Sequence, residues 1–428
     1  SNTNESNDRT VLEYSSIVLF DSTFEDKAVG LPTLHNGVWQ KKLLRILTMF
    51  KKSLAAVAVL GAFAGTALAA DVQLYGLVDL GVNWTSTKVY NADTNSYDKT
   101  DSFGLNSGQN SGSRFGLKGV EDLGNGYKVG FVLENGFKAD DGALETGGRL
   151  FHRESLLFVQ SAWGELSFGR TGGLDAGTGR YNLMGSGASA IGTGWDKVGD
   201  SRVALMGTGD RMDNTITYKS PDFAGFNVYA QASLKKDNVT DLDNKGVEGS
   251  SDADRYYAVA ATYGVGALKT GLVYSQTDYS RVTVNTKTGS DDTSHVISAF
   301  ANYDFGMVKP MVAVQYWDGG LNVASGDKHF KNDGGLTKGY GMVVGATAPL
   351  FGGSFKATVG YNDYEDLADV KTYDGNNLML GAAYEYPLSK RTSVYTAAGY
   401  SQIEKDMVAG DKIKNKTSEV MFGMIPKF

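Results

Sequence analysis

Residues 111–137 read SGSRFGLKGVEDLGNGYKVGFVLENGF, and this stretch decides the fold. Apolar and polar or small side chains alternate in two runs, Phe115 and Leu117 against Arg114, Gly116 and Lys118, then Tyr127, Val129, Phe131 and Leu133 against Lys128, Gly130 and Glu134. A period of two places one face of a strand in an apolar medium and the other in water. The short connection 122–126 joins the runs, so the stretch predicts two antiparallel, half-buried strands.

The same alternation continues along the chain from residue 72, where VQLYGLVDLGV again places apolar side chains on one face. Most of the predicted strands have about 9–11 residues, the length of a tilted strand that crosses a bilayer. No segment carries a helical stripe of three turns. The sixteen predicted strands are 72–82, 113–120, 127–134, 150–160, 164–170, 214–220, 225–234, 255–263, 267–277, 294–304, 307–317, 339–348, 354–363, 377–386, 392–400 and 418–428.

The connections alternate between short and long. The long ones are rich in Gly, Asn, Asp, Ser, Thr and Lys, and they are predicted at 83–112, 171–213, 235–254, 278–293, 318–338 and 401–417. This rhythm is typical of transmembrane barrels, with tight turns at one rim and polar loops at the other. Because lipid forbids an open sheet edge, the sheet must close, and about 16 strands leave a water-filled lumen. We therefore predict an all-β fold, a transmembrane antiparallel up-and-down β-barrel.

The N-terminal region lacks this pattern. Residues 49–69 predict a secretory signal peptide, with Lys51 and Lys52 before an apolar run and small residues at 67–69. A short transmembrane anchor is the alternative for this segment. Residues 1–48 are interpreted as an upstream extension outside the mature protein. The remaining chain, 70–428, is predicted to be a single β-barrel domain.

Composition excludes several classes of protein. Asp and Glu (48) outnumber Lys and Arg (41), which argues against nucleic acid as a partner. The absence of Cys excludes disulfide scaffolds, thiolate metal sites and thiol nucleophiles. A mean hydropathy of −0.25 argues against a bundle of membrane-spanning helices. We expect neither a metal nor another cofactor.

The last predicted strand ends on an aromatic residue. Phe422, Met424 and Phe428 share one face of this strand. An alternating C-terminal strand that ends in Phe looks like the outer-membrane insertion signal of bacterial barrels, which the barrel-assembly machinery reads.

With these residues in place, the sequence resembles the general porins of Gram-negative bacteria, the branch typical of beta-proteobacteria and Neisseria. The resemblance spans essentially the whole mature chain, and 111–137 is its most specific stretch. It implies a homotrimer in the outer membrane, surrounded by lipid and lipopolysaccharide, that passes small hydrophilic solutes and ions by passive diffusion. It also implies a long third extracellular loop folded into the pore. The matching stretches are 73–82, 111–137, 164–170, 218–226, 384–395 and the terminal Phe428.

The resemblance also assigns pore-lining residues. Arg114 matches the lumen-facing Arg of the family's SRxG motif, and Arg153 and Arg170 match basic positions on the next strands. By alternation, Lys118 and Lys128 also face inward, and Glu134 supplies a countercharge. Glu154 beside Arg153, and the parity that Arg170 shares with Leu166 and Phe168, leave the sign of ion selectivity open.

The loop 171–213 is the predicted constriction loop. Its apolar residues are expected to pack on the inner wall, namely Leu183, Met184, Ile191, Trp195, Val203, Leu205 and Met206. Its charged residues are candidates for the pore lining, above all Asp175, Arg180, Asp196, Asp200 and Arg202. An ordinary surface loop with scattered charges is the alternative.

Three other functions compete with a general diffusion pore. A substrate-specific channel for a sugar or an organic anion needs an aromatic track, to which Tyr181 and Trp195 are candidates. An outer-membrane barrel hydrolase needs a catalytic site, yet the chain has only four His and no G-x-S-x-G, Walker or H-E-x-x-H motif. A soluble β-rich protein or adhesin conflicts with the lipid-compatible strand faces. We therefore predict no catalytic residues.

Overall fold

The computed structural model describes residues 72–91, 94–187, 203–205, 209–238, 246–279, 293–321, 336–367, 373–407, 410 and 412–428. Residues 68–428 form one compact unit. The upstream extension (1–48) and the signal peptide (49–69) lie outside the described residues, so both stay predictions.

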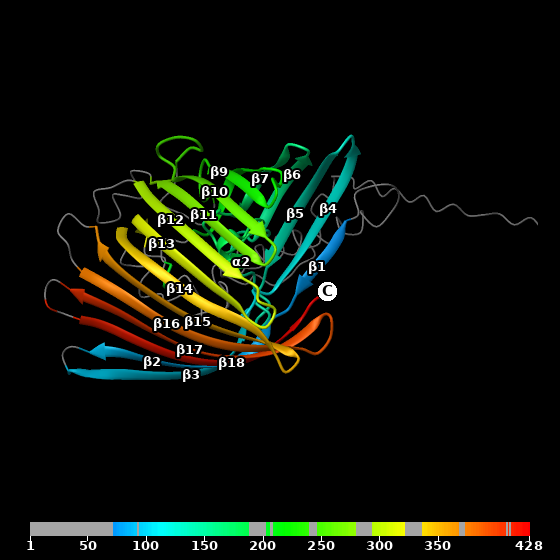
Figure 1. Cartoon of the computed structure of the whole chain (residues 1–428). Helices are drawn as coiled ribbons and strands as arrows, with labels where there is room; N and C mark the ends of the chain where they lie inside the picture. The colour runs from blue at the N-terminus through cyan, green and yellow to red at the C-terminus, as the bar shows by residue number, and fades with distance from the viewer. Residues whose placement is uncertain are drawn as a thin grey trace, which may run out of the picture. The chain divides into compact units, whose positions relative to one another are not determined.

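The described chain is a run of antiparallel strands (Figure 1). Its one described α-helix is short, α2 (Leu183–Gly187). No helix in the described ranges is long and apolar enough to cross a membrane. The strands are β1 (Gln73–Leu77), β2 (Leu80–Asn91), β3 (Ser96–Ser107), β4 (Arg114–Gly124), β5 (Tyr127–Gly136), β6 (Glu154–Ser161), β7 (Gly164–Gly172), β8 (Arg211–Lys219), β9 (Phe226–Ser233), β10 (Arg255–Val265), β11 (Leu268–Asp278), β12 (Thr293–Tyr303), β13 (Lys309–Leu321), β14 (Leu336–Leu350), β15 (Gly353–Asp366), β16 (Tyr373–Pro387), β17 (Thr392–Met407) and β18 (Lys412–Pro426).

The sheet closes on itself through its first and last strands. From β4 to β18, each strand pairs with the next one along the chain. β18 then pairs with β2, and β1 pairs with β4. The terminal Phe428 exchanges two backbone hydrogen bonds of 3.0 Å with Gly76 beside this seam. Closure satisfies the backbone groups that lipid would otherwise leave without partners.

The eighteen strands of the described residues make sixteen crossings. Only Val78 and Asp79 separate β1 from β2, and residues 108–113 separate β3 from β4. Leu77 pairs with Arg114 and Leu80 pairs with Ser107, so each of these strand pairs is one interrupted crossing. The sixteen crossings confirm the number predicted from the alternation.

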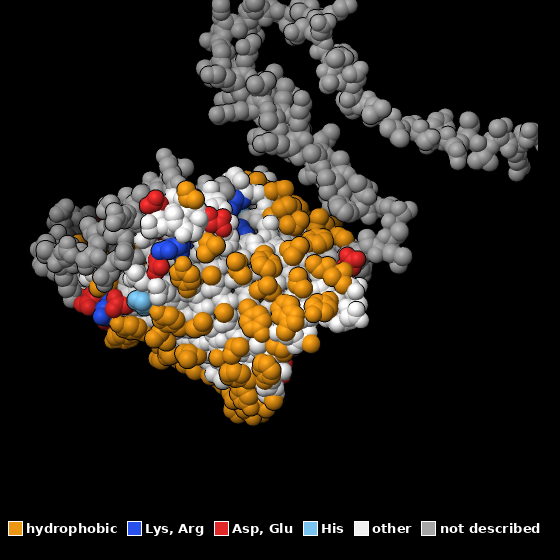
Figure 2. All heavy atoms as spheres, turned by 90° about the horizontal axis from the view of Figure 1, so that it is seen from above, with side chains coloured by type: hydrophobic (Ala, Val, Ile, Leu, Met, Phe, Trp, Pro, Cys, Tyr) orange, Lys and Arg blue, Asp and Glu red, His pale blue; other side chains and the backbone are white. Residues whose placement is uncertain are grey.

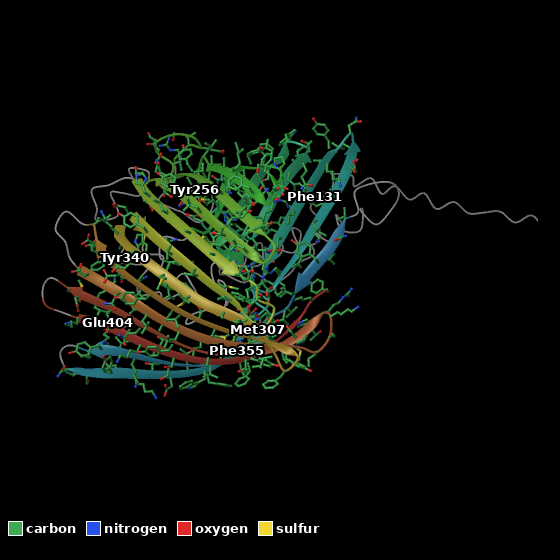
Figure 3. All side chains as sticks on the ribbon, viewed as in Figure 1. Phe131, Tyr256, Met307, Tyr340, Phe355 and Glu404 are labelled. Atoms are coloured by element: carbon green, nitrogen blue, oxygen red, sulfur yellow. The ribbon has the colours of Figure 1, made fainter. Side chains whose placement is uncertain are left out.

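Side chains alternate between an exposed, apolar outer face and a buried inner face, which is polar except where the third loop packs on it. On β11, Leu272 is 54% exposed, whereas its neighbour Val273 on the inner face is buried. Polar side chains are fully buried at inward positions such as Thr217, Ser298 and Asn362. Figure 2 shows hydrophobic side chains covering much of the strand surface that is in view. In Figure 3, the labelled Tyr340 and Phe355 are exposed outer residues and Tyr256 is a buried inner one.

The predicted long loops at 83–112 and 401–417 are wrong. β2 and β3 form a hairpin whose connection is only 92–95, and β17 reaches Met407 before β18 begins at Lys412. β3 is exposed along most of its length on both faces, so its sequence carries no apolar alternation. The backbone ladder to β2 holds it in place instead. Polar strand ends of this kind resemble loops in sequence because no lipid-facing side is required.

The segment that follows β7 packs on the inner wall, which confirms the prediction of an inward-folded third loop. Six of its described residues, Leu174, Leu183, Met184, Val203, Ala204 and Leu205, belong to one buried apolar cluster. The same cluster contains inner-wall residues from β9 to β16, among them Tyr229, Tyr256, Val273, Phe300, Val343 and Met379. Ile191, Trp195 and Met206 lie outside the described residues.

Candidate functional site

The beginning of the third loop is anchored by a buried carboxylate. Asp175 accepts hydrogen bonds from the hydroxyls of Tyr256 (2.8 Å) and Ser275 (2.6 Å) on β10 and β11. Burial raises the pKa of Asp175, and the two hydrogen bonds oppose that rise. Next to it, the backbone N–H of Leu174 donates to Gln231 on β9 (3.0 Å). These contacts fix the loop against the wall that it faces.

The far part of the loop rests in a cradle on β14 to β16. The Nδ2 atom of Asn362 donates to the carbonyl oxygens of Val203 (2.8 Å) and Ala204 (3.2 Å), and Asn377 donates to Val203 (3.3 Å). A Cβ atom on Gly341 would collide with the carbonyl oxygen of Ala204. The loop backbone approaches this closely only because position 341 has no side chain.

Between these two anchors the loop crosses β6 and β7. Arg180 donates from Nε (2.6 Å) and Nη2 (2.7 Å) to Glu165, and its guanidinium lies 3.8 Å from the ring centroid of Phe158. The hydroxyl of Tyr181 donates to the same Glu165 (3.0 Å). A bidentate carboxylate pair of this kind fixes both position and orientation.

A polar cavity of about 650 Å³ lies where the loop faces the wall of β4 to β8. The loop supplies backbone and small polar groups from 177–179, Asn182 and Gly185, and the segment between β3 and β4 adds Gly108, Asn110, Ser111 and Gly112. Four arginines and four carboxylates line it, namely Arg114, Arg153, Arg170 and Arg211 with Glu134, Glu145, Glu154 and Asp210. The formal charges of this lining therefore cancel.

Glu134 is the centre of the ion pairs on the β4–β6 wall. Its Oε1 atom lies 2.7 Å from Nε of Arg153 and 4.0 Å from Nη1 of Arg114, and Oε2 accepts from the hydroxyl of Tyr75 (3.0 Å). Arg211 has a weaker partner, because Nη1 lies 3.9 Å from the solvent-exposed carboxylate of Asp210. The guanidinium groups of Arg114 and Arg211 thus make long ion pairs, of 4.0 and 3.9 Å, at the cavity.

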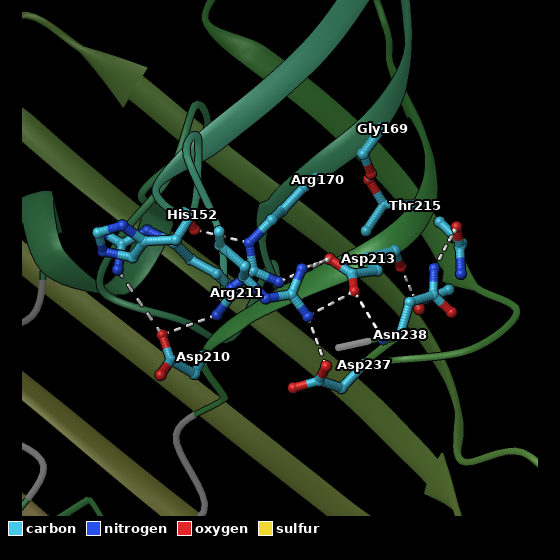
Figure 4. A network of polar contacts seen from close by, with 12 residues as sticks. His152, Gly169, Arg170, Asp210, Arg211, Asp213, Thr215, Asp237 and Asn238 are labelled. Carbon is cyan, nitrogen blue, oxygen red and sulfur yellow. Dashed lines mark hydrogen bonds and ion pairs between the residues drawn. The ribbon is translucent and has the colours of Figure 1, made fainter. Parts of the chain in front are cut away.

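A second network of ion pairs and hydrogen bonds lies around Asp213 (Figure 4). Asp213 on β8 binds Arg170 (2.7 Å) and accepts two bonds from Arg149 (2.9 and 2.8 Å). Arg149 also reaches Asp237 after β9 (2.5 Å), and Arg170 donates to the backbone oxygen of His152 (2.6 Å). The network joins the connection 137–153 to three strands or strand ends.

Glu145, which lies outside the strands, has a strongly lowered pKa. Its Oε2 atom lies 3.0 Å from Nε2 of His152 and 3.4 Å from Nη1 of Arg153. Burial pushes the pKa of Glu145 upward, but the hydrogen bond from His152 and the charge of Arg153 prevail and lower it to about 2. The carboxylate therefore stays ionised in any ordinary medium.

The structure brings some of the predicted site residues together and separates others. Arg114, Glu134, Arg153 and Arg170 line the cavity. Lys118 lies at a smaller cavity of about 360 Å³ with Arg180, and Lys128 lies at the turn end of β5, 3.9 Å from Asp122. Asp175 anchors the loop. Asp196, Asp200 and Arg202 lie outside the described residues, so their roles stay predictions.

Glu145, His152 and Arg211 line the cavity but were not among the predicted site residues. Arg211 begins β8 directly after the loop, and Arg170 lies near the end of β7, two residues before Gly172. This position at a strand end next to the loop is the feature from which Arg211 could have been predicted as a site residue. Glu145 and His152 belong to a connection without periodicity and had no such signal.

Comparison of the sequence with known proteins gives a consistent result. A family profile described as Gram-negative porin matches residues 55–406. An outer membrane porin protein of Bordetella pertussis is 33% identical over 390 residues, which cover 82% of this chain and 94% of that protein. Outer membrane porin protein 32 of Delftia acidovorans is 30% identical, with 81% and 88% covered. Major outer membrane protein P.IB of Neisseria meningitidis is 28% identical, with 82% and 93% covered.

Solved structures share the fold. An anion-selective porin from Comamonas acidovorans superposes with a TM-score of 0.61 at 24% identity, covering 84% of this chain and 100% of that one. The outer membrane channel DcaP of Acinetobacter baumannii superposes with a TM-score of 0.55 at 15% identity, covering 85% and 99%.

Proposed function

Because the chain belongs to the family of Gram-negative porins, outer-membrane channels for passive diffusion, we propose that the cavity between its third loop and strands β4 to β8 is the constriction of the channel. The observation that carries this proposal is the position of the charges. Arg114, Arg153 and Glu134 lie where the inward-folded loop faces the wall, while the outer face of the barrel is apolar.

The mechanism needs no reacting group. Solutes diffuse through water in the lumen, the gap between loop and wall limits their size, and the charges of the lining bias the passage of ions. Since four arginines are matched by four carboxylates, we expect weak selectivity governed by Arg114, Arg153 and the loop. Family and fold point to a channel rather than an enzyme, and we infer that the chain has no catalytic site.

A general pore is favoured over a substrate-specific one. The hydroxyl of Tyr181 is hydrogen bonded to Glu165 (3.0 Å) and lies 2.8 Å from that of Ser167, and its ring packs on Tyr229. This tyrosine therefore packs the loop on the wall rather than presenting its ring to a sugar or an organic anion.

Exposed side chains at the C-terminal end of the chain support a proposal for how the protein is inserted into the outer membrane. Phe422, Met424 and Phe428 are all about half exposed on the closing strand β18 and after it, as expected of a signal for the barrel-assembly machinery. We propose that residues 49–69 direct export and that the mature chain forms a homotrimer surrounded by outer-membrane lipid and lipopolysaccharide.

Arg114→Ser is expected to shift the reversal potential under a salt gradient toward that of a more cation-preferring pore, because it removes one positive charge from the constriction. Planar-bilayer recording measures the shift. Lys128→Ser is the matched control, since Lys128 lies at the turn end of β5, and we expect it to leave the potential unchanged. Equal shifts in both variants, or none in Arg114→Ser, would remove Arg114 from the constriction.

Acid is expected to act on the connection 137–153 through Glu145. Because its pKa is lowered from 4.5 to about 2, ionised Glu145 contributes its full stabilisation above about pH 4.5 and loses it as the pH falls toward 2. We expect the contribution of Glu145 to the single-channel conductance to be constant above about pH 4.5 and to be lost below about pH 3. Glu145→Gln should lack this transition, and an unaltered transition in that variant would assign it to other carboxylates.

A further inference from the structure

We propose that Asp79 is a positioning residue of the constriction, which it shapes without lining it. It holds residues 108–113 as an inward bulge that narrows the channel and supports Arg114. The inference rests on the proposed function, because it takes the charged cavity to be the constriction.

The bulge follows from an unequal count of residues on two paired crossings. Leu77 pairs with Arg114 and Leu80 pairs with Ser107. Two residues of the first crossing, Val78 and Asp79, therefore face the six residues 108–113 of the second. Surplus residues of a bulge leave the ladder, and here they turn inward, because Gly108, Asn110, Ser111 and Gly112 all line the cavity.

Asp79 fixes the backbone of the bulge by accepting hydrogen bonds from it. Its side chain is completely buried. Oδ2 accepts the backbone N–H groups of Asn110 (2.8 Å) and Ser111 (2.7 Å), and Oδ1 accepts the hydroxyl of Tyr395 on β17 (2.7 Å). The backbone oxygen of Asp79 accepts the N–H of Gly108 (2.8 Å). A buried carboxylate persists only with such donors, and its removal leaves two amides of the bulge without their acceptor.

The bulge contacts the arginines of the cavity. Nε of Arg114 donates to the carbonyl oxygen of Gly112 (2.8 Å). A Cβ atom at position 112 would lie only 2.8 Å from Nη1 of Arg153, so the backbone of the bulge abuts this guanidinium as well. Both arginines share Glu134. A movement of the bulge therefore moves the charges that bias ion passage.

The bulge packs closely against the strands next to it. The side chain of Gln109 is almost completely buried and donates to the hydroxyl of Tyr395 (3.4 Å). It occupies the space that a side chain at Gly81 would fill, since a Cβ atom there would collide with Gln109 and with the backbone of Phe422. The seam between β2 and β18 thus accommodates the bulge through a glycine, Gly81.

The test compares single-channel conductance and reversal potential in folded protein. Asp79→Ala is expected to raise conductance on the order of 1.5-fold, because the bulge loses its anchor. Arg114→Ser should then shift the reversal potential less in the Asp79→Ala background than in the wild type, since coupled residues are not additive. Asp79→Asn keeps an oxygen for the two amides and should retain most of the wild-type behaviour.

Two further variants keep the proposal falsifiable. Deletion of 109–112 leaves two residues facing two and, because four is even, preserves the alternation on β4. The deletion is expected to raise the conductance at least as much as is expected of Asp79→Ala. It therefore tests the proposal even if Asp79→Ala does not fold. Glu419→Ala is the matched control, because Glu419 on β18 is a buried inward carboxylate that is bonded to Asn83 and does not line the cavity. The conductance of this variant should stay at the wild-type value.

The proposal is overturned by wild-type conductance in folded Asp79→Ala or in the deletion variant, by additive effects of Asp79→Ala and Arg114→Ser, or by an equal rise in Glu419→Ala. A wild-type protein that does not conduct would instead refute the proposed function, so the two failures are distinguishable.

Discussion

Leu272→Arg is expected to lower the free energy of unfolding in a bilayer by about 2–4 kcal/mol, the cost of an arginine on the lipid face near the midplane. Leu272 is 54% exposed on the outer face of β11, midway between Leu268 and Gln276, whose partners on the flanking strands are the outward tyrosines Tyr303 and Tyr257. Aromatic rings of this kind mark the two membrane interfaces, so the substituted guanidinium would lie in hydrocarbon. Denaturant titration of the protein refolded into lipid vesicles measures the loss.

Gln276→Arg is the control for this substitution. Gln276 lies on the same face of the same strand, one outward position beyond Tyr274. There the arginine reaches water, and the expected cost is at most about 1 kcal/mol. Equal costs at both positions would show that the face of β11 is not exposed to lipid in the way that the alternation requires.

Gly341→Val is expected to displace the third loop from the inner wall and to raise the single-channel conductance about twofold, because the loop narrows the lumen. A Cβ atom at this position would collide with the carbonyl oxygen of Ala204, which is backbone and has no rotamer to adopt. The displaced loop would also lose its hydrogen bonds to Asn362.

A graded pair of variants on β15 accompanies this prediction. Asn362→Ala removes two hydrogen bonds to the loop and should raise conductance in the same direction, but less. Thr358→Ala, on the same face of the same strand, removes a hydroxyl that bonds only the wall at Val344, and it should leave the conductance unchanged. Unchanged conductance in both Gly341→Val and Asn362→Ala would show that the docked loop does not limit the current.

The sequence predicts the crossings well because every second residue of a crossing faces lipid and has to be apolar. Val82, Leu272 and Phe422 each face outward as their parity indicates. Beyond the apolar belt that requirement ends. β3 is exposed on both faces, and only its ladder to β2 reveals it as a strand, which no local pattern records.

The site was predictable where parity and family resemblance apply, and not where distant segments meet. Arg114 follows from both, Glu134 from parity and Arg153 from the resemblance, and all three line the cavity. The pairs of Arg149 with Asp213 and Asp237 join residues 64 and 88 positions apart, and such pairs leave no trace in spacing. The bulge at 108–113 has the Gly, Ser and Asn composition of any loop, and only the unequal pairing around Asp79 distinguishes it.

The central claim is that the strands enclose a continuous column of water, and the conductance of the purified protein in a planar lipid bilayer tests it most directly. We predict stepwise currents whose size rises in proportion to the conductivity of the bathing salt, as expected of a water-filled pore. A bilayer that stays electrically tight after the folded protein has inserted would contradict the account.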